Sequence, residues 1–270
     1  MMRWKLTIAY DGAPFRGWQS QSGGNTVQDL LEAAVGRILG AAVTVHGSGR
    51  TDAGVHALGQ VAHFDVPDGW RMDAAAWLRA LQVHLPPQIR VMRAEAAEPR
   101  FHARFDAVGK TYRYRLWHGA VLPPHEWQRA WHVPHVLDEA RLREVLSLCA
   151  GRHDFAAFAA FRGDVRSDAD TVRTIHRAGL ERRGDEWVLT WRGDGFLYRM
   201  VRLLTGAAVR VAQGRAGVAW FRGLLDEPAG RKNHHQAPAG GLYLVSVDYG
   251  TAGDVHTCPE RAAGAADGIP

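Results

Sequence analysis

The sequence predicts an α+β fold of two ferredoxin-like (βαββαβ) domains, with mainly antiparallel sheets that meet at a central basic cleft. Three observations support this prediction. The order strand, helix, strand, strand, helix, strand is expected once in each half of the chain. The 270 residues suffice for two domains of about 100 to 130 residues each. The hydrophobic content of 46% and the charged content of 23% are those of a globular protein.

The first domain is expected over residues 1–105. Residues 4–10 (WKLTIAY) alternate apolar and polar side chains, which is typical of a strand. Thr26 is expected to cap a helix, because Asp29 follows three residues later and an apolar stripe continues to Ile38. The remaining elements are expected as strands at 42–45, 60–66 and 89–94 and a helix at 74–85 that Asp73 caps and Pro86 and Pro87 end.

The second domain is expected over residues 106–250, followed by a disordered tail at 251–270. Strands are predicted at 110–117, 175–182, 186–192 and 242–249, with helices at 138–149 and 196–212. Three extra pieces interrupt this second copy: a strand near Trp131, the FAAFAAF segment around Phe158, and a short helix at 218–225.

Composition excludes several classes of protein. No apolar run approaches the roughly 18 residues of a membrane span, and the N-terminus lacks the apolar stretch of a signal peptide, so we expect a cytoplasmic protein. Cys149 and Cys258 form no CxxC pair, which argues against a zinc ribbon or a disulfide scaffold. The net charge of +5 favours a polyanionic partner, although a base-composition bias toward arginine would also produce it.

The segment HGSGRTDAGVH, residues 46–56, is too rich in glycine for a helix and too polar for a core. In an extended chain Arg50 and Asp52 lie on one face, so we expect the guanidinium to keep the carboxylate ionised. An ionised and oriented carboxylate can act as a nucleophile or a base. Gly47, Gly49 and Gly54 would then let the backbone approach a bulky ligand closely.

Other interpretations of this segment remain open. Asp52 could cap a turn and merely pair with Arg50. A phosphate loop fits poorly, because GSGRTD lacks the third glycine of a dinucleotide fingerprint and the Gly-Lys-Ser/Thr of a P-loop. His46, His56 and His63 raise the possibility of zinc, but no His-Glu-x-x-His accompanies them, so we expect core or surface histidines and no metal.

The segment GSGRTDAGVHALGQVAHFD resembles the signature of the TruA family of tRNA pseudouridine synthases. Four further blocks resemble that family in the same order: YDGAPFRGWQSQ with TVQDLLEAAV, FHARFDAVGKTYRYRLW, GFLYRMVRLLTG, and APAGGLYLVSVDYG. The resemblance covers roughly residues 4–250. Five separate blocks in the right order are far more specific than any single motif.

The resemblance implies a role for each of five residues. Asp52 matches the catalytic aspartate, and Arg50 the arginine that enters the space left by the flipped uridine. Tyr112 matches a tyrosine that stacks on the target base, Arg202 a basic residue that pairs with the aspartate, and Leu244 an apolar residue lining the uracil pocket. From the residues alone, Tyr112 could be an ordinary strand aromatic, Arg202 a solvated helix charge and Leu244 part of the core.

The implied activity is the isomerisation of uridine to pseudouridine at positions 38, 39 and 40 of the tRNA anticodon stem-loop, by a homodimer that needs no cofactor. The N1–C1′ glycosidic bond breaks and the uracil rejoins the ribose through C5, after the uridine has been flipped out of its stem. Asp52 could attack C1′, attack C6 or abstract a ribose proton, and the sequence does not choose among these. We expect phosphate contacts from arginines, and therefore RNA binding that weakens steeply with salt.

Three alternatives compete with this function: an RNA-binding protein that keeps the scaffold without the chemistry, a metal-dependent hydrolase that uses the histidines, and a synthase with another RNA target. Some positions also depart from the family pattern. Ser48 stands where alanine is more usual, Gln236 where threonine is, and Gly240 where histidine is. The stretch at residues 164–170 is unusually acidic for a surface near RNA.

Overall fold

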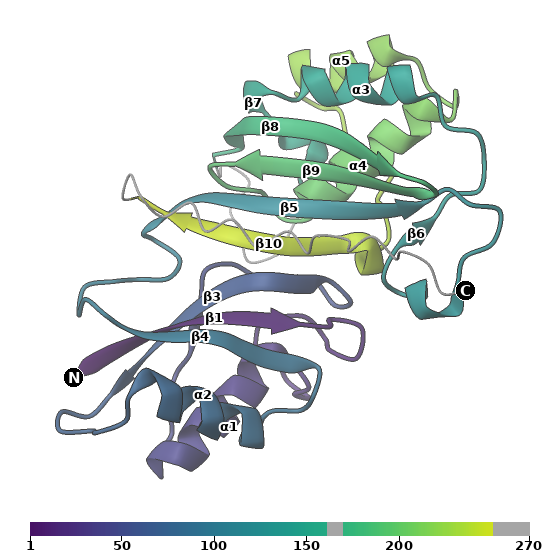
Figure 1. The fold of residues 1–270 in the computed structure, drawn as a ribbon. Helices are drawn as coiled ribbons and strands as arrows, with labels where there is room; N and C mark the ends of the chain where they lie inside the picture. Colours follow the sequence, from purple (N-terminus) through teal and green to yellow (C-terminus); the bar gives the residue numbers. More distant parts are fainter. Residues whose placement is uncertain (161–169, 251–270) are drawn as a thin grey trace, which may run out of the picture.

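The protein has a mixed α+β fold built on one large, mostly antiparallel sheet (Figure 1). A computed structural model describes residues 1–160 and 170–250. The acidic stretch at 164–170, apart from Asp170, and the predicted disordered tail at 251–270 lie outside the described residues.

The described chain contains strands, α-helices and short 3-10 turns. The strands are β1 (Met2–Tyr10), β2 (His46–Gly47), β3 (His56–Val66), β4 (Ile89–Ala97), β5 (Ala107–Trp117), β6 (Trp131–His132), β7 (Gly151–Asp154), β8 (Val172–Arg183), β9 (Glu186–Gly193) and β10 (Leu242–Tyr249). The α-helices are α1 (Val27–Leu39), α2 (Ala74–His84), α3 (Glu139–Leu148), α4 (Met200–Ala212) and α5 (Val218–Asp226), and short 3-10 turns lie at Pro124–Glu126, Ala156–Phe158 and Ala239–Gly241.

The last strand joins the two halves of the chain into a single sheet. The strand order is β4-β1-β3-β10-β5-β9-β8-β7, with β2 paired to β3 and β6 paired to β5. β10 is antiparallel to β5 but parallel to β3, where the pairs are Tyr243 with His56 and Leu244 with Ala57. In Figure 1 β10 and β3 lie next to each other across the middle of the molecule. The two halves are therefore connected through backbone pairing as well as through side chains.

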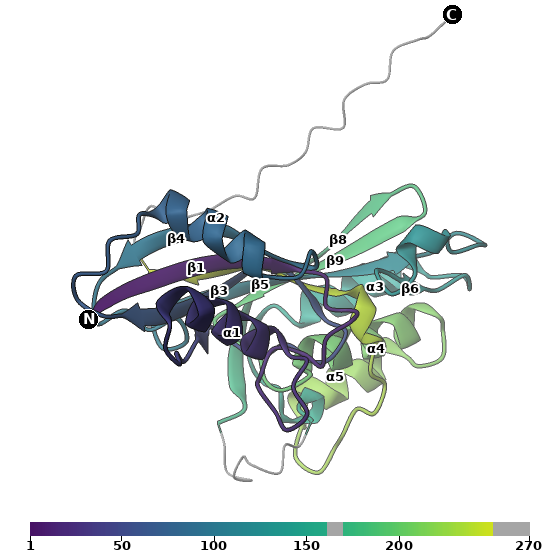
Figure 2. The ribbon, with the colours of Figure 1, turned by 90° about the horizontal axis from the view of Figure 1, so that it is seen from below.

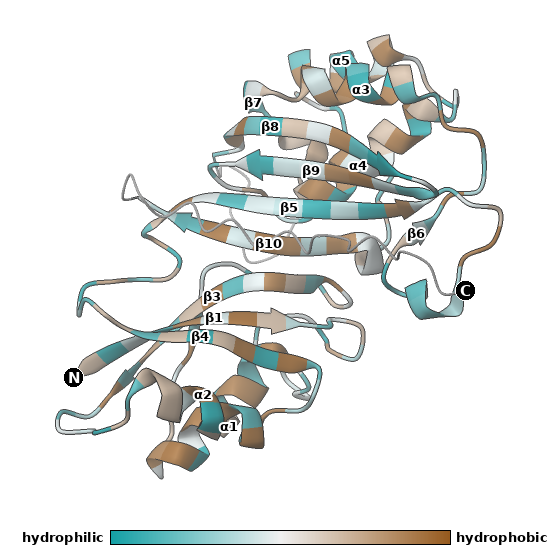
Figure 3. Cartoon of the chain, in the orientation of Figure 1, coloured by the Kyte–Doolittle hydropathy of each residue, from teal (hydrophilic) through white to brown (hydrophobic). Residues whose placement is uncertain are grey.

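Alternating hydropathy along the strands explains which face of the sheet the helices cover. In β1 the buried positions alternate with partly exposed ones, and hydropathy changes from residue to residue along the strands (Figure 3). Two tryptophans show the packing in the first half: Trp77 of α2 lies 5.9 Å from Trp4 between ring centroids, and its ring is fully buried. Figure 2 shows α1 on the same side of the sheet as α4 and α5.

Side-chain caps begin the helices at the predicted residues. The Thr26 hydroxyl accepts from the backbone N–H of Asp29 at 3.2 Å, and Asp73 caps α2 through the N–H of Ala76 at 2.7 Å. These caps satisfy amide groups that have no partner within the helix.

Two predicted details are wrong, and an edge strand was not predicted. Residues 42–45 form no strand, because side chains of α1 take the backbone groups of Val45: its N–H donates to Glu32 at 3.0 Å and its carbonyl accepts from Gln28 at 3.2 Å. The helix predicted from residue 196 begins at Met200, after Arg199 adopts a left-handed conformation with φ of 61°. The sequence also gave no indication of β7, a four-residue edge strand paired with β8.

Candidate active site

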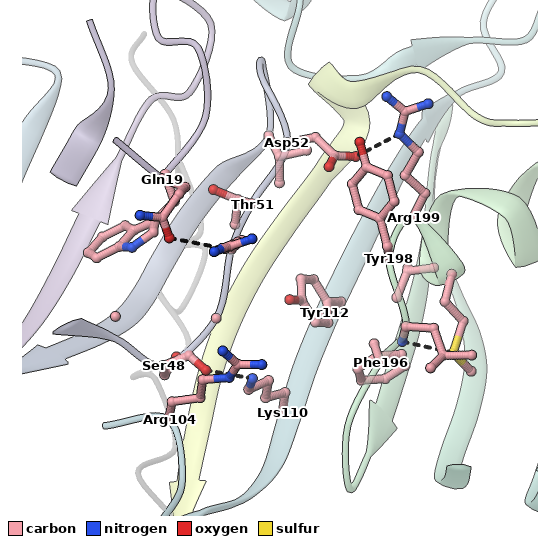
Figure 4. A pocket seen from close by; sticks show the side chains of 18 of the residues that line it. Gln19, Ser48, Thr51, Asp52, Arg104, Lys110, Tyr112, Phe196, Tyr198 and Arg199 are labelled. Carbon is pink, nitrogen blue, oxygen red and sulfur yellow. Dashed lines mark hydrogen bonds and ion pairs between the residues drawn. The ribbon is translucent and has the colours of Figure 1, made fainter. Parts of the chain in front are cut away.

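A cavity of about 1000 Å³ lies between the two halves, on the helix-covered side of the sheet. The glycine-rich segment before β3 forms one wall, and the residues that lead into α4 form the other (Figure 4). β5 supplies the floor through Lys110 and Tyr112. Among the described lining residues, seven are lysine or arginine and two are aspartate. The cavity is therefore suited to a negatively charged ligand.

Asp52 and Arg202 form an ion pair across this cavity. Arg202 Nη1 donates to Asp52 Oδ2 at 2.7 Å, a distance typical of a charge-assisted hydrogen bond. The Arg202 side chain is 11% exposed and the Asp52 side chain 19%. Arg202 Nε also donates to the carbonyl of Ala237 at 2.9 Å, which holds the guanidinium in place. One carboxylate oxygen is thus fixed from the second half of the chain, while the side chain as a whole still reaches the cavity.

Arg50 does not make the contact that its spacing predicted. Among the described residues, the cations within ion-pair distance of Asp52 are Arg202 and Arg199, the latter at 3.9 Å. Arg50 Nε instead donates to the side-chain oxygen of Gln19 at 2.9 Å, and Arg50 is exposed at the cavity wall. The predicted contact assumed an extended backbone at residues 50–52. These residues form no regular strand, so the side chains of Arg50 and Asp52 need not lie on one face.

Tyr112 lies on the cavity floor with its ring edge-on to Phe196, at 5.2 Å between ring centroids. The tyrosine is 9% exposed. Burial raises the pKa of its hydroxyl well above the ordinary value, and the negative charge of Asp52 acts in the same direction. A neutral phenol beside an apolar ring offers a flat surface on which a planar base can pack.

Leu244 is 1% exposed and is paired in register with Tyr112 across β10 and β5. It is absent from the described residues that line the cavity, whereas Leu242, two positions earlier on β10, is among them. The predicted contact between Leu244 and uracil therefore remains a prediction, and Leu242 is the leucine of β10 that the cavity reaches.

Two glycines of the segment, Gly47 and Gly54, are required by the protein's own structure, and the close approach of a ligand remains a prediction. A Cβ on Gly47 would lie 2.4 Å from the indole ring of Trp18, which is 2% exposed. Gly54 has φ of +79°, a conformation that other residues rarely adopt. Thr51, next to Asp52, is fixed from the core, because its hydroxyl is 2.8 Å from the hydroxyl of Tyr10. These contacts tie the segment around Asp52 to the core of the first half.

Both departures from the family pattern near β10 have local partners. With its amide oxygen facing Arg202, Gln236 accepts from Nη2 at 2.6 Å and from Nη1 at 3.3 Å. The loop that contains Gln128 passes close to Gly240. A Cβ at Gly240 would lie 2.4 Å from the Gln128 carbonyl oxygen, so a larger residue would displace this loop. That same carbonyl lies 2.8 Å from His56 Nε2. Gln236 therefore helps to position the Arg202 guanidinium, and the replacement is compatible with the ion pair.

Sequence reasoning missed five of the seven described cations that line the cavity, and Arg199 and Lys110 are two of them. Arg199 stands three residues before Arg202 within the quoted block GFLYRMVRLLTG, and nothing in that block signals its positive φ. Lys110 begins the alternation KTYRY, which places it on the same face of β5 as Tyr112. This alternation was the sequence feature from which the position of Lys110 beside Tyr112 could have been predicted.

His46, His63 and His102 do lie together, with His63 stacked on His46 at 5.0 Å between ring centroids. Burial lowers the pKa of His63 to about 4, with the positive charge of Arg3 adding to the effect. The described residues contain no group of three or more histidines, cysteines or carboxylates arranged to bind a metal ion. Nor do they include a helix with the length and hydropathy of a membrane span.

Comparisons with known proteins agree with the quoted motifs. A family model described as tRNA pseudouridine synthase matches residues 6–106 and 146–250. A protein of Akkermansia muciniphila named tRNA pseudouridine synthase A is 46% identical over 253 residues, covering 92% of this chain and 96% of the relative. Proteins of the same name from Solibacter usitatus and Solidesulfovibrio magneticus are 43% and 45% identical, covering 92% and 94% of this chain and 100% and 93% of their own lengths.

Proposed function

The chain belongs to the tRNA pseudouridine synthase family, and from that membership we propose that it isomerises uridines 38, 39 and 40 of the tRNA anticodon stem-loop, with Asp52 as the catalytic residue. Membership of this family makes the protein an isomerase that acts on uridine in tRNA. The observation that carries the assignment of Asp52 is its ion pair with Arg202 inside the basic cavity.

The reaction exchanges one bond to the ribose for another. The N1–C1′ bond breaks, the uracil turns, and a C5–C1′ bond forms, after which C5 loses its proton and N1 gains one. No electron transfer and no leaving group enter this balance. The uridine must first leave its stacked position, at a cost of about a few kcal/mol. A carboxylate fixed at the cavity wall can then meet the extruded nucleoside.

The residues around Asp52 support this sequence of events. Arg202 binds one carboxylate oxygen and so orients the group toward the cavity. Tyr112 provides the surface on which the extruded uracil packs, a contact of about 1–3 kcal/mol for a stacked base. Arg50, exposed at the wall, would enter the gap that the flipped nucleotide leaves. Leu242 lines the cavity and would shield the detached uracil from water.

Tritium release tests this proposal directly. A tRNA transcript labelled with tritium at uridine C5 is incubated with the protein, with and without a chelator, and the released tritium and the modified positions are measured. We expect release that the chelator does not change, and release at the level of the protein-free control for Asp52→Asn and Asp52→Ala. Asp68→Asn is the matched control, because Asp68 is exposed and pairs with the N-terminus at 2.7 Å. Full activity of either Asp52 variant would reject the assignment, and binding without any release by the wild type would favour a non-catalytic RNA-binding protein.

We interpret the two halves as ferredoxin-like domains, residues 1–105 and 106–250. Support comes from the strand orders β4-β1-β3-β2 and β10-β5-β9-β8, which place equivalent strands of the two halves in the same positions. The homodimer follows from the family resemblance and the cytoplasmic location from the sequence of the N-terminus, and both remain proposals. Light scattering that gave a monomer at micromolar concentration would refute the dimer.

A further inference from the structure

Lys110 is a half-buried cation with little to stabilise its charge. Its Nζ donates to the carbonyl of Ser48 at 2.8 Å, and this is its only hydrogen bond within residues 1–160 and 170–250. An ammonium group has three N–H donors, so two remain for other acceptors. A Cβ on Gly49 would lie 2.9 Å from Nζ, which shows how closely the ammonium group approaches the segment that carries Asp52.

A second cation acts on Lys110 from the same side of the cavity. Arg104 lines the cavity with Lys110, and Figure 4 shows the guanidinium and the ammonium group in the same corner, near Ser48. Burial lowers the pKa of Lys110 to about 8, and the positive charge of Arg104 adds to the effect. Two cations held near each other destabilise the unliganded protein, and a bound anion reverses this effect.

The described carboxylates of the cavity do not supply that anion. The two described carboxylates that line it are Asp52 and Asp170. Asp52 is paired with Arg202, and Asp170 lies 3.8 Å from Arg173. In the described part of the chain no ion pair involves Lys110 or Arg104. Within the described residues, neither Lys110 nor Arg104 therefore has a carboxylate partner.

We propose that Lys110 and Arg104 form a phosphate-binding subsite that takes a phosphodiester group next to the flipped uridine. Lys110 and Tyr112 are two residues apart on one face of β5, about 7 Å along the strand. If Tyr112 packs against the uracil, Lys110 lies within the reach of the same nucleotide's backbone. The ammonium group then bridges the substrate phosphate and the Ser48 carbonyl, so that substrate binding and the position of the Asp52 segment are coupled. This inference rests on the proposed function and names the substrate group that this corner of the cavity binds.

A double-mutant cycle between protein and RNA tests the subsite. Anticodon stem-loop RNAs carry a neutral methylphosphonate at either phosphodiester flanking the target uridine, and kcat/KM for pseudouridine formation and Kd are measured for each. One of the two linkages is expected to weaken wild-type binding roughly tenfold, about 1.4 kcal/mol. For Lys110→Met, Kd is expected to change less than about twofold with that linkage, since the contact is already lost. The slope of log Kd against log salt should also be smaller by about 1 than for wild type. Lys110→Arg should recover part of the sensitivity.

Arg113→Met is the matched control for lost charge, because Arg113 is exposed on the opposite face of the same strand and should stay as sensitive as wild type. If Lys110→Met responds to the neutral linkage as strongly as wild type, Lys110 only holds Ser48 and the subsite is wrong. If neither neutral linkage changes Kd or kcat/KM of the wild-type protein, the subsite is also refuted, and no variant is needed. Should Lys110→Met unfold, Arg104→Met, an exposed position, completes the same cycle. A wild type that makes no pseudouridine in unmodified RNA refutes the proposed function instead.

Discussion

Replacement of Arg202 should expose how strongly the two halves of the site depend on each other. Arg202→Met removes the hydrogen bond to Asp52 at 2.7 Å and the one to the Ala237 carbonyl at 2.9 Å. A hydrogen bond between charged groups contributes about 1.5–3 kcal/mol and a neutral one about 1 kcal/mol. Because the Asp52 side chain is 19% exposed, water can solvate the stranded carboxylate in part. We therefore expect the free energy of unfolding to fall by about 2–3 kcal/mol.

The coupling between the two side chains is the decisive quantity. In Asp52→Asn the guanidinium keeps an amide oxygen as acceptor, so the loss of stability should be smaller, about 1–2 kcal/mol. The double variant lacks both charges and should be more stable than the sum of the single losses predicts, by at least about 1 kcal/mol. Urea unfolding of all four proteins gives this coupling energy. Losses that add to within about 0.5 kcal/mol would show that Arg202 and Asp52 do not stabilise each other.

Three further predictions follow from the structure. Tyr112→Phe should keep most tritium-release activity because its ring remains, whereas Tyr112→Ala should lower kcat/KM by at least about tenfold, and equal losses would disprove base stacking. His63 has a folded-state pKa of about 4 against 6.5 when unfolded, so the unfolded chain binds the extra proton and the free energy of unfolding should fall as pH drops from 6.5 toward 4. His63→Gln should flatten this slope in urea titrations, and an unchanged slope would assign it to other groups. Gly47→Ala should lower stability by about 1–3 kcal/mol in thermal unfolding, since the methyl group overlaps Trp18; a neutral effect would mean that the indole moves freely.

Local features of the fold could be predicted from the sequence because each depends on neighbouring residues. The alternation in β1 and the caps at Thr26 and Asp73 are patterns of a few positions, and the structure has them where expected. The strand expected at 42–45 failed because Glu32, more than ten positions away, takes the backbone N–H of Val45. The joining of both halves into one sheet depends on two residue pairs between β3 and β10, which no local pattern reveals.

In the candidate site, too, motifs identified some residues, while contacts between distant segments could not be predicted. Asp52 and Tyr112 were identified through motifs, and both line the cavity. The orientation of Arg50 could not be predicted, because it depends on Gln19 in a different loop. Lys110 was overlooked because one lysine in an alternating strand looks like an ordinary exposed charge, and only its proximity to Ser48 and Arg104 distinguishes it.

The late position of β10 in the chain has a consequence for synthesis on the ribosome. β3 is complete at Val66, but the strand that pairs with its free side ends at Tyr249. Until that strand emerges, one edge of the nascent first half carries unpaired amide and carbonyl groups that can pair with another chain. Chaperones that bind nascent polypeptides would protect this edge, and truncation before β10 should yield aggregates rather than a smaller folded protein.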